Sequence, residues 1–138
     1  MTIQYSTLLP GGKGINVSRI FNELGCSNIA WRFLGGFTGN FIEKELIKLN
    51  LNTDFVSIKE ETRLNVKIKT QTETEINEQG PHITSKELND FKAKFAMLTA
   101  NDIVVFAGSL LPDLKEGFYF ELIKIIKQKS TICDRYYR

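Results

Sequence analysis

Few residues of this chain are of the types that mark special environments: its 138 residues include two cysteines, three prolines, one histidine and one tryptophan. Cys26 and Cys133 lie far apart and belong to no Cys-x-x-Cys or Cys/His cluster, so neither a zinc site nor a disulfide framework is expected. His82 stands in a Pro-His turn without a suitable catalytic or metal-binding neighbour, and we interpret it as a surface residue. The cysteine usage indicates a reduced, cytoplasmic location.

The chain also lacks an excess of charge of one sign, because 18 Lys and Arg residues accompany 16 Asp and Glu residues for a formal net charge of +2. The basic residues are evenly spread, which excludes the patch expected of a nucleic-acid or membrane-surface protein. No apolar run approaches the roughly 18 residues of a membrane span, and residues 1–9 lack the basic start of a secretory signal. We therefore expect neither nucleic acid nor membrane as a partner.

What the sequence does contain is an ordinary globular composition, 42% hydrophobic and 25% charged, at the length of one domain. Apolar residues at helical spacing predict a helix over residues 15–24, and Gly25 follows where a left-handed stop is expected. The apolar run 29–34 predicts a strand closed by two glycines, and residues 41–49 return to helical spacing. The apolar face of the first helix comprises Val17, Ile20, Phe21 and Leu24.

Further along the chain, strict alternation predicts a half-exposed strand over residues 63–69, with residues 74–76 as its return partner. The segment 84–87, Thr-Ser-Lys-Glu, forms a capping box that predicts the start of another helix. The unbroken apolar run within residues 102–107 predicts a strand buried on both faces. We also expect a helix over residues 118–126 and a strand at residues 131–133.

Helices thus alternate with short apolar strands, which predicts an α/β fold with a mainly parallel sheet and one exposed antiparallel ribbon. Ligands of such sheets collect beyond the carboxyl ends of the strands. The pairs Gly35-Gly36 and Gly108-Ser109 each directly follow a predicted strand. Both pairs are therefore candidate edges of a binding cleft.

A glycine-rich turn, Gly11-Gly12-Lys13-Gly14, immediately precedes the first predicted helix. Free backbone N–H groups, the positive end of the helix dipole and the lysine charge can all face one anion there, and Asn16 adds a polar side chain. The run is neither a P-loop, since the lysine is followed by glycine, nor GxGxxG, since a valine occupies the last glycine position. A flexible turn without a ligand fits the same residues.

Two later parts of the sequence also carry polar groups that could bind a phosphate or a hydroxyl: the strand predicted over residues 63–69, and Ser109. Arg63, Asn65 and Lys67 share one face of the alternating strand, where charge-assisted hydrogen bonds to a phosphate or hydroxyl would be available. The solvated face of an exposed strand explains the same pattern. Ser109, directly after a predicted buried strand, either binds a substrate or caps a turn.

Three motifs taken together resemble those of the ribokinase-like (PfkB) sugar kinases. They are residues 11–19, Gly-Gly-Lys-Gly-Ile-Asn-Val-Ser-Arg; residues 33–39, Phe-Leu-Gly-Gly-Phe-Thr-Gly; and residues 61–67, Glu-Thr-Arg-Leu-Asn-Val-Lys. Their order and spacing also match. The later segments 73–81 and 102–110 are similar to the 1-phosphofructokinase and tagatose-6-phosphate kinase branch, with 1-phosphofructokinase the more similar. The resemblance extends to about Asp134.

The resemblance implies a ribokinase-like three-layer fold with a mainly parallel sheet and a small β lid ribbon at about residues 62–77. It also implies a carbohydrate kinase, a phosphotransferase to an alcohol group, that converts fructose 1-phosphate to fructose 1,6-bisphosphate with ATP and Mg²⁺. Tagatose 6-phosphate is the alternative substrate. By the same resemblance, the residues that hold the sugar phosphate are Gly11, Gly12, Lys13, Asn16, Arg63 and Ser109.

The sequence departs from the family pattern at both ends. The family begins with a strand and an Asn-Pro-Ala-Ile-Asp-like segment whose aspartate contacts the sugar, and residues 1–9 do not match it. The family's ATP site and its Gly-Ala-Gly-Asp-type motif, which provides the catalytic base, lie in the carboxyl half, and no aspartate here follows such glycines. We therefore expect residues 1–138 to be a partial kinase domain, truncated at both ends, with no catalytic residue and no properly bound ATP or metal.

Such a chain is expected to be inactive or nearly so by itself, because phosphoryl transfer requires both positioning and electrostatic stabilisation of the moving group. A non-catalytic module that binds a sugar phosphate or a protein partner is the alternative. A sheet cut partway exposes apolar surface and unpaired edges. Poor solubility or self-association, including a homo-oligomer, is therefore expected.

Overall fold

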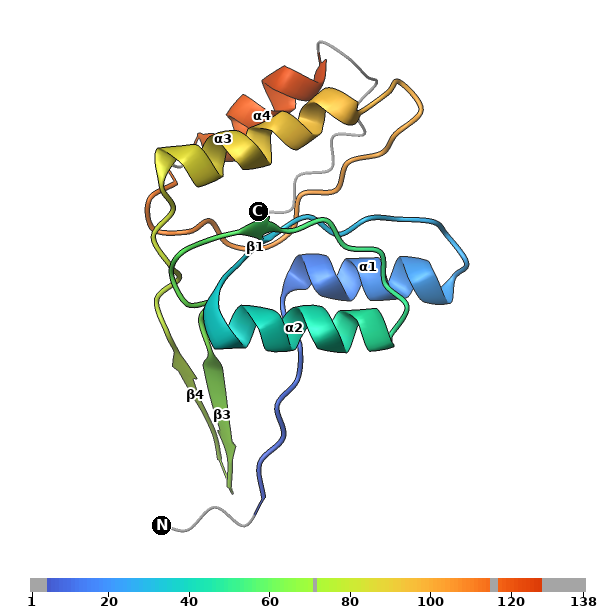
Figure 1. The fold of residues 1–138 in the computed structure, drawn as a ribbon. Coiled ribbons are helices and arrows are strands. Elements are labelled where there is room, and N and C mark those ends of the chain that lie inside the picture. The colour runs from blue at the N-terminus through green and yellow to red at the C-terminus, as the bar shows by residue number, and fades with distance from the viewer. Residues whose placement is uncertain (1–4, 71, 115–116, 128–138) are drawn as a thin grey trace.

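A computed structural model describes residues 5–70, 72–114 and 117–127 of the chain. Two helices lie on each side of a short parallel strand pair, and an antiparallel ribbon projects from this body (Figure 1). This arrangement is a three-layer α/β fold, as the alternation of helices and strands predicts. In chain order the elements are α1 (Lys13–Glu23), β1 (Phe33–Leu34), α2 (Gly36–Lys48), β2 (Val56–Ser57), β3 (Asn65–Lys69), β4 (Glu73–Asn77), α3 (Ser85–Lys94), the short 3₁₀ helix η1 (Phe95–Met97) and α4 (Phe118–Lys127).

The parallel pair β1–β2 is at the centre of the fold. Phe33 pairs with Val56 and Leu34 with Ser57, and an isolated bridge joins Ala30 to Thr53. The predicted strand over residues 29–34 is thus confirmed, although its regular part is short. Its partner was not predicted from the sequence, because polar residues interrupt the apolar pattern of residues 51–58.

Apolar side chains from both helical layers pack against this pair. On one side, Leu34 of β1 is buried against α1 and α2 in a cluster completed by Ile15, Ile42, Leu46 and Leu51. On the other side, Phe33 packs at a ring-centroid distance of 4.7 Å from Phe91 of α3. The core of the α3–α4 layer consists of Phe95, Phe118, Leu122 and Ile126.

Helix α1 buries only part of the apolar face that its sequence predicts. Ile15 and Ser18 are buried, whereas Ile20 and Leu24 of the predicted apolar face are 56% and 70% exposed. The Ser18 hydroxyl donates to the Asn28 side chain, whose amide donates to the Ser18 carbonyl at 3.3 Å. The predicted helix is confirmed. Its predicted apolar face is only partly buried, because Val17 and Phe21 are half-buried and line a pocket whereas Ile20 and Leu24 are exposed.

The ribbon β3–β4 is antiparallel, with Asn65 opposite Asn77 and Lys69 opposite Glu73. The predicted strand and return partner are confirmed. The predicted half-burial is wrong, because every residue of the two strands is exposed except the partly buried Ile68. Lys67 forms ion pairs across the ribbon with Glu73 and Glu75, and its hydrogen bond and charge attraction to Glu75 raise the pKa of Lys67.

The capping box that starts α3 is present as predicted. The Glu87 backbone N–H donates to the Thr84 hydroxyl oxygen, and the Glu87 carboxylate accepts from the Thr84 backbone N–H at 2.7 Å. The hydrogen bond from the Thr84 backbone is the largest influence that lowers the pKa of Glu87. Helix α4 also matches its predicted range.

Residues 102–107 do not form the strand that their apolar run predicts. They pair with no segment that the structure describes. Ile103 is 78% and Val105 50% exposed, while Val104 and Phe106 pack against the α3–α4 core. The prediction is wrong because an apolar run becomes a buried strand only where a neighbouring strand lies within hydrogen-bonding distance. The strand predicted at residues 131–133 lies outside the described residues.

No helix among the described residues has the length and apolarity to cross a membrane. That part of the chain also holds no cluster of three or more His, Cys, Asp or Glu side chains suited to a metal ion.

Candidate functional site

The glycine turn before α1 lies at the edge of a pocket and contacts Arg32. Gly12 caps the helix without a side-chain hydrogen bond, and its φ of 124° lies in the region that favours glycine. The Asn16 N–H donates to the Gly12 carbonyl, which leaves the earlier N–H groups of the helix without helical partners. A Cβ at Gly12 would lie 2.8 Å from Nη1 of Arg32. The positive φ favours glycine here, and the absence of a side chain leaves room for the guanidinium of Arg32.

A pocket of about 1010 Å³ lies between this turn, residues 26–33 and residues 101–111. Five of the six predicted binding residues line it: Gly12, Lys13, Asn16, Arg63 and Ser109. Gly11 does not line it, but its carbonyl oxygen accepts a hydrogen bond from Arg32 at 2.7 Å. The fold thus brings together positions almost a hundred residues apart in the chain. Whether they bind a ligand stays a prediction.

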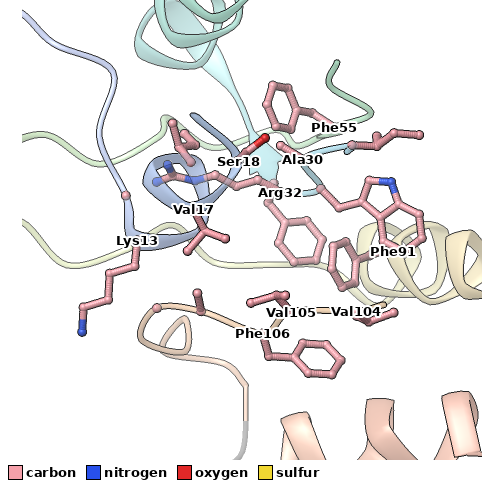
Figure 2. A pocket seen from close by; sticks show the side chains of 18 of the residues that line it. Lys13, Val17, Ser18, Ala30, Arg32, Phe55, Phe91, Val104, Val105 and Phe106 are labelled. Carbon is pink, nitrogen blue, oxygen red and sulfur yellow. The ribbon is translucent and has the colours of Figure 1, made fainter. Parts of the chain in front are cut away.

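Figure 2 shows the walls of this pocket. Ala30, Arg32 and Phe55 lie along one side, and Val104, Val105 and Phe106 lie along the opposite side. The wall formed by residues 104–106 is apolar. Lys13 begins α1 and the guanidinium of Arg32 reaches Gly11 beside it, which makes that end of the pocket the candidate anion site.

Arg63 is held at the pocket by the two residues before it. Thr62 is buried; its hydroxyl accepts from the Gly35 N–H at 2.9 Å, and its own N–H donates to the Gly35 carbonyl at 3.0 Å. Glu61 accepts from the Thr38 N–H at 2.7 Å and from the Thr38 hydroxyl at 3.0 Å. Residues 61–67 are therefore fastened to the start of α2 immediately before the ribbon begins.

The loop that carries Ser109 approaches the glycine turn from the other half of the chain. A Cβ at Gly14 would lie 3.8 Å from the Ala107 carbonyl oxygen, so the loop and the first turn of α1 are neighbours. Gly108 has a φ of 110°, and its carbonyl accepts from the Tyr119 hydroxyl at 3.0 Å. Burial raises the pKa of Tyr119. Ser109 itself is exposed at the pocket mouth.

The other predicted cleft edge lies elsewhere. Gly35 and Gly36 line a separate, smaller cavity of about 240 Å³ beside α2. A Cβ at Gly35 would lie 2.1 Å from the Glu60 carbonyl oxygen, so this glycine is required by the close passage of the backbone. The Gly35-Gly36 pair therefore positions the segment that holds Arg63 and does not line the main pocket.

One basic residue of the pocket was not predicted from the sequence. Arg32 is half-buried in the segment leading into β1, and its guanidinium reaches the glycine turn. Burial lowers the pKa of Arg32, and the nearby charge of Arg63 lowers it further. The available signal was an arginine inside the otherwise apolar run 29–34.

His82 lies on the surface, as predicted. Its ring Nδ1 lies 2.9 Å from the Asp113 carboxylate, which holds the pKa of His82 above its ordinary value. Trp31 packs edge-on against Phe95, as expected of a core residue, but its buried indole nitrogen has no hydrogen-bond partner among the described residues.

Comparison with known proteins identifies related sequences along almost the whole chain. The model of the pfkB family carbohydrate kinases matches residues 2–138. The 1-phosphofructokinase of Bacillus subtilis is 44% identical over 127 residues, which are 92% of this chain and 42% of that protein. The tagatose-6-phosphate kinase of Staphylococcus epidermidis is 38% identical over 128 residues, which are 90% of this chain and 41% of that protein.

Solved structures of phosphofructokinases have a similar fold. The crystal structure of Escherichia coli phosphofructokinase-2 in complex with fructose-6-phosphate superposes with a TM-score of 0.80 at 26% identity, covering 88% of this chain and 42% of that one. The chain thus spans about two fifths of the length of the relatives it matches.

Proposed function

The chain belongs to the pfkB family of carbohydrate kinases, and we propose that it carries the sugar-phosphate-binding part of a 1-phosphofructokinase, with residues 62–77 as its lid ribbon. The observation that supports this proposal is the convergence of Gly12, Lys13, Arg63 and Ser109 on one pocket. The 44% identity to a 1-phosphofructokinase favours fructose 1-phosphate as the sugar.

Each group of this pocket has a definite task in binding. The free N–H groups at the start of α1 and the Lys13 ammonium attract the phosphate that the sugar already carries. Arg63 offers a planar pair of N–H donors that matches two phosphate oxygens. Asn16 and Ser109 can hydrogen-bond the hydroxyls of the sugar. These contacts would orient the sugar with its free 6-hydroxyl away from the anion site.

The reaction itself joins that 6-hydroxyl oxygen to the terminal phosphorus of ATP as the bond to ADP breaks and the hydroxyl proton passes to a base. ATP and Mg²⁺ supply the phosphoryl group and neutralise its charge in such reactions. The described residues of this chain bind and orient the sugar, and we assign no proton-transfer step to them. We therefore propose that the chain alone has no kinase activity.

Two measurements on the purified chain test these proposals. Calorimetric titration with fructose 1-phosphate should give saturable heat that is lost on Arg63→Gln and kept on Lys44→Gln, a matched change on the exposed face of α2. A coupled assay for ADP should give no signal above background. Absence of saturable binding would contradict the binding proposal, and ATP-dependent product would contradict the proposed inactivity.

Tagatose 6-phosphate is the second candidate, favoured by the 38% identity to a tagatose-6-phosphate kinase. Titration of the same chain with both sugars separates the two candidates. Tighter binding of tagatose 6-phosphate would replace the first assignment and leave the anion site unchanged.

A further inference from the structure

Arg32 lies in an unusual position for a charged side chain. It precedes β1 in the central strand pair and is half-buried. Figure 2 shows its side chain reaching across to α1, while Lys13 points away from it. Nη1 of Arg32 donates to the Gly11 carbonyl at 2.7 Å, the one hydrogen bond of this side chain within the described residues. A guanidinium has five N–H donors, so most of them remain for another acceptor.

The charge of Arg32 is also unbalanced. No carboxylate forms an ion pair with Arg32 or Arg63 in the part of the chain that the structure describes. Among the described residues, Asp102 is the one acidic residue on the pocket lining, and its carboxylate accepts hydrogen bonds from the Thr99 N–H at 2.7 Å and the Thr99 hydroxyl at 2.9 Å. Two guanidinium groups thus share a pocket without a counter-ion from those residues.

This arrangement has an electrostatic cost that a ligand can remove. Arg63 lies close enough for its charge to lower the pKa of Arg32, and partial burial strengthens that repulsion. A dianion between the two groups would replace repulsion by two attractive pairs. Neither arginine has another described charged partner that would compete for this role.

We propose that Arg32 and Arg63 together bind one phosphomonoester dianion, with Arg32 as a second guanidinium ligand beside the glycine turn. The inference rests on the proposed function, because it assigns this group to the phosphate that the sugar carries. Arg63 lies just before β3 and Arg32 just before β1, so the phosphate would join the base of the ribbon to the central strand pair.

A purely structural role is the competing explanation for Arg32. Its hydrogen bond to Gly11 could simply hold the glycine turn in place, with no contact to a ligand. Arg32→Lys separates the two roles only in part, since lysine keeps the charge but loses the fork of donors. Chemical modification of the wild-type chain, in which Arg32 is not substituted, distinguishes the two roles directly.

The first experiment measures the dissociation constants of inorganic phosphate and fructose 1-phosphate by calorimetry for the wild-type chain and for Arg32→Gln, Arg32→Lys and Arg19→Gln. Arg19 lies exposed on α1 outside the pocket lining and carries the same charge. Loss of a charge-assisted hydrogen-bonding pair should weaken both ligands by about tenfold or more in Arg32→Gln. Arg32→Lys should be intermediate, and Arg19→Gln should match the wild type.

The second experiment needs no variant, so a folding defect cannot obscure it. The wild-type chain is treated with phenylglyoxal, which modifies arginine, with and without 10-fold excess phosphate over its dissociation constant (about 90% occupancy), and the modified peptides are quantified by mass spectrometry. Phosphate should protect Arg32 and Arg63 and leave Arg19 unprotected. Modification of Arg32 at the same rate in both samples would overturn the proposal.

The outcomes of the two experiments distinguish a failure of the Arg32 assignment from a failure of the proposed function. Binding of fructose 1-phosphate that depends on Arg63 but is unchanged in Arg32→Gln would sink the Arg32 assignment and leave the proposed function intact. If Arg32→Gln and Arg19→Gln weaken ligand binding equally, the effect comes from net charge alone, and the Arg32 assignment is overturned. No binding of either ligand to the wild type would contradict both proposals.

Discussion

The carboxylate of Glu61 accepts hydrogen bonds from the backbone N–H and the hydroxyl of Thr38, 23 residues earlier in the chain. Helix α2 begins at Gly36 and has no side-chain cap from its own N-cap residue, Gly35. Glu61 supplies both a cap and a negative charge at the positive end of this helix. The same contact places Arg63 two residues further on at the edge of the pocket.

Glu61→Ala should therefore destabilise the fold and weaken ligand binding together. Loss of an N-cap of this kind costs about 1 kcal/mol in the free energy of unfolding. Urea titration followed by circular dichroism measures that cost, with Glu43→Ala on the exposed side of α2 as the matched control. A Glu61→Ala chain as stable as Glu43→Ala would show that the cap contributes nothing.

Gly36 and Gly25 provide a matched pair for separating backbone strain from steric conflict. Their φ angles are 66° and 73°, so alanine is strained at both by about 1–2 kcal/mol. A Cβ at Gly36 would lie 1.5 Å from Oε2 of Glu61, whereas at Gly25 it would meet no atom within 4 Å. Gly36→Ala should therefore lower the free energy of unfolding more than Gly25→Ala.

The difference between the two alanine variants should be about the value of the Glu61 cap, roughly 1 kcal/mol, because the flexible carboxylate can move aside only by leaving Thr38. Urea titration of both variants in the Glu61→Ala background supplies the control. In the Glu61→Ala background, Gly36→Ala should lower the free energy of unfolding by no more than Gly25→Ala does. Persistence of the difference would assign it to another contact.

The parts of the fold that the sequence predicts correctly are those with a local cause. The capping box of Thr84 and Glu87 lies within four residues, and the alternation of the ribbon is visible strand by strand. The start of α2 at Gly36, five residues before the predicted start, depends on Glu61 across a long separation. No local pattern of residues 36–40 contains that information.

The site shows the same division between local and long-range causes. The glycine turn is recognisable because its glycines are consecutive in the sequence, and Gly12 indeed adopts a φ of 124° beside Arg32. The sequence does not predict Arg32 as a site residue, because an arginine within an apolar run does not indicate that it will contact Gly11. Residues 102–107 show the opposite case. Their strong apolar pattern predicts a buried strand, but no described strand lies beside them to pair with.

The surface pair of His82 and Asp113 predicts a pH window of stability. Asp113 raises the pKa of His82 above 6.5 through a hydrogen bond and charge attraction, with a smaller contribution from Glu60. The stabilisation from His82 is thus present below pH 6.5 and is lost as the pH rises through the raised pKa. The same hydrogen bond lowers the pKa of Asp113 below 3.8, so its contribution is present above that pH and is lost as the pH falls through the lowered value.

The two contributions overlap between pH 3.8 and 6.5. Urea midpoints of the wild type and of Asp113→Asn should differ most in this interval, and the difference should shrink as the pH rises through the raised pKa of His82 or falls through the lowered pKa of Asp113. Asparagine can still accept the hydrogen bond from the Ile83 N–H, which is 2.8 Å from Oδ2 in the wild type, so the comparison isolates the charge. A difference in urea midpoint that does not change with pH would mean that titration of His82 and Asp113 does not affect stability.

Exposed apolar side chains on one wall of the pocket predict self-association of the chain. Ile103 is 78% and Val105 50% exposed along a segment that forms no strand with the rest of the described chain. A second copy can cover these side chains and supply the missing backbone hydrogen bonds, and each buried side chain of this size contributes roughly 1.5–3 kcal/mol. Sedimentation velocity should show the wild type as dimers or larger species at micromolar concentration.

A charged substitution within residues 102–107 should prevent this self-association. Ile103→Lys places a charge where a second copy would pack and should shift the distribution to the monomer, whereas Ile47→Lys, on the exposed side of α2, should not. If both variants become equally monomeric, the association arises from general hydrophobicity and not from the unpaired segment. A wild-type chain that is monomeric and melts cooperatively would refute the prediction, because the exposed edge would then be stable in water without a partner.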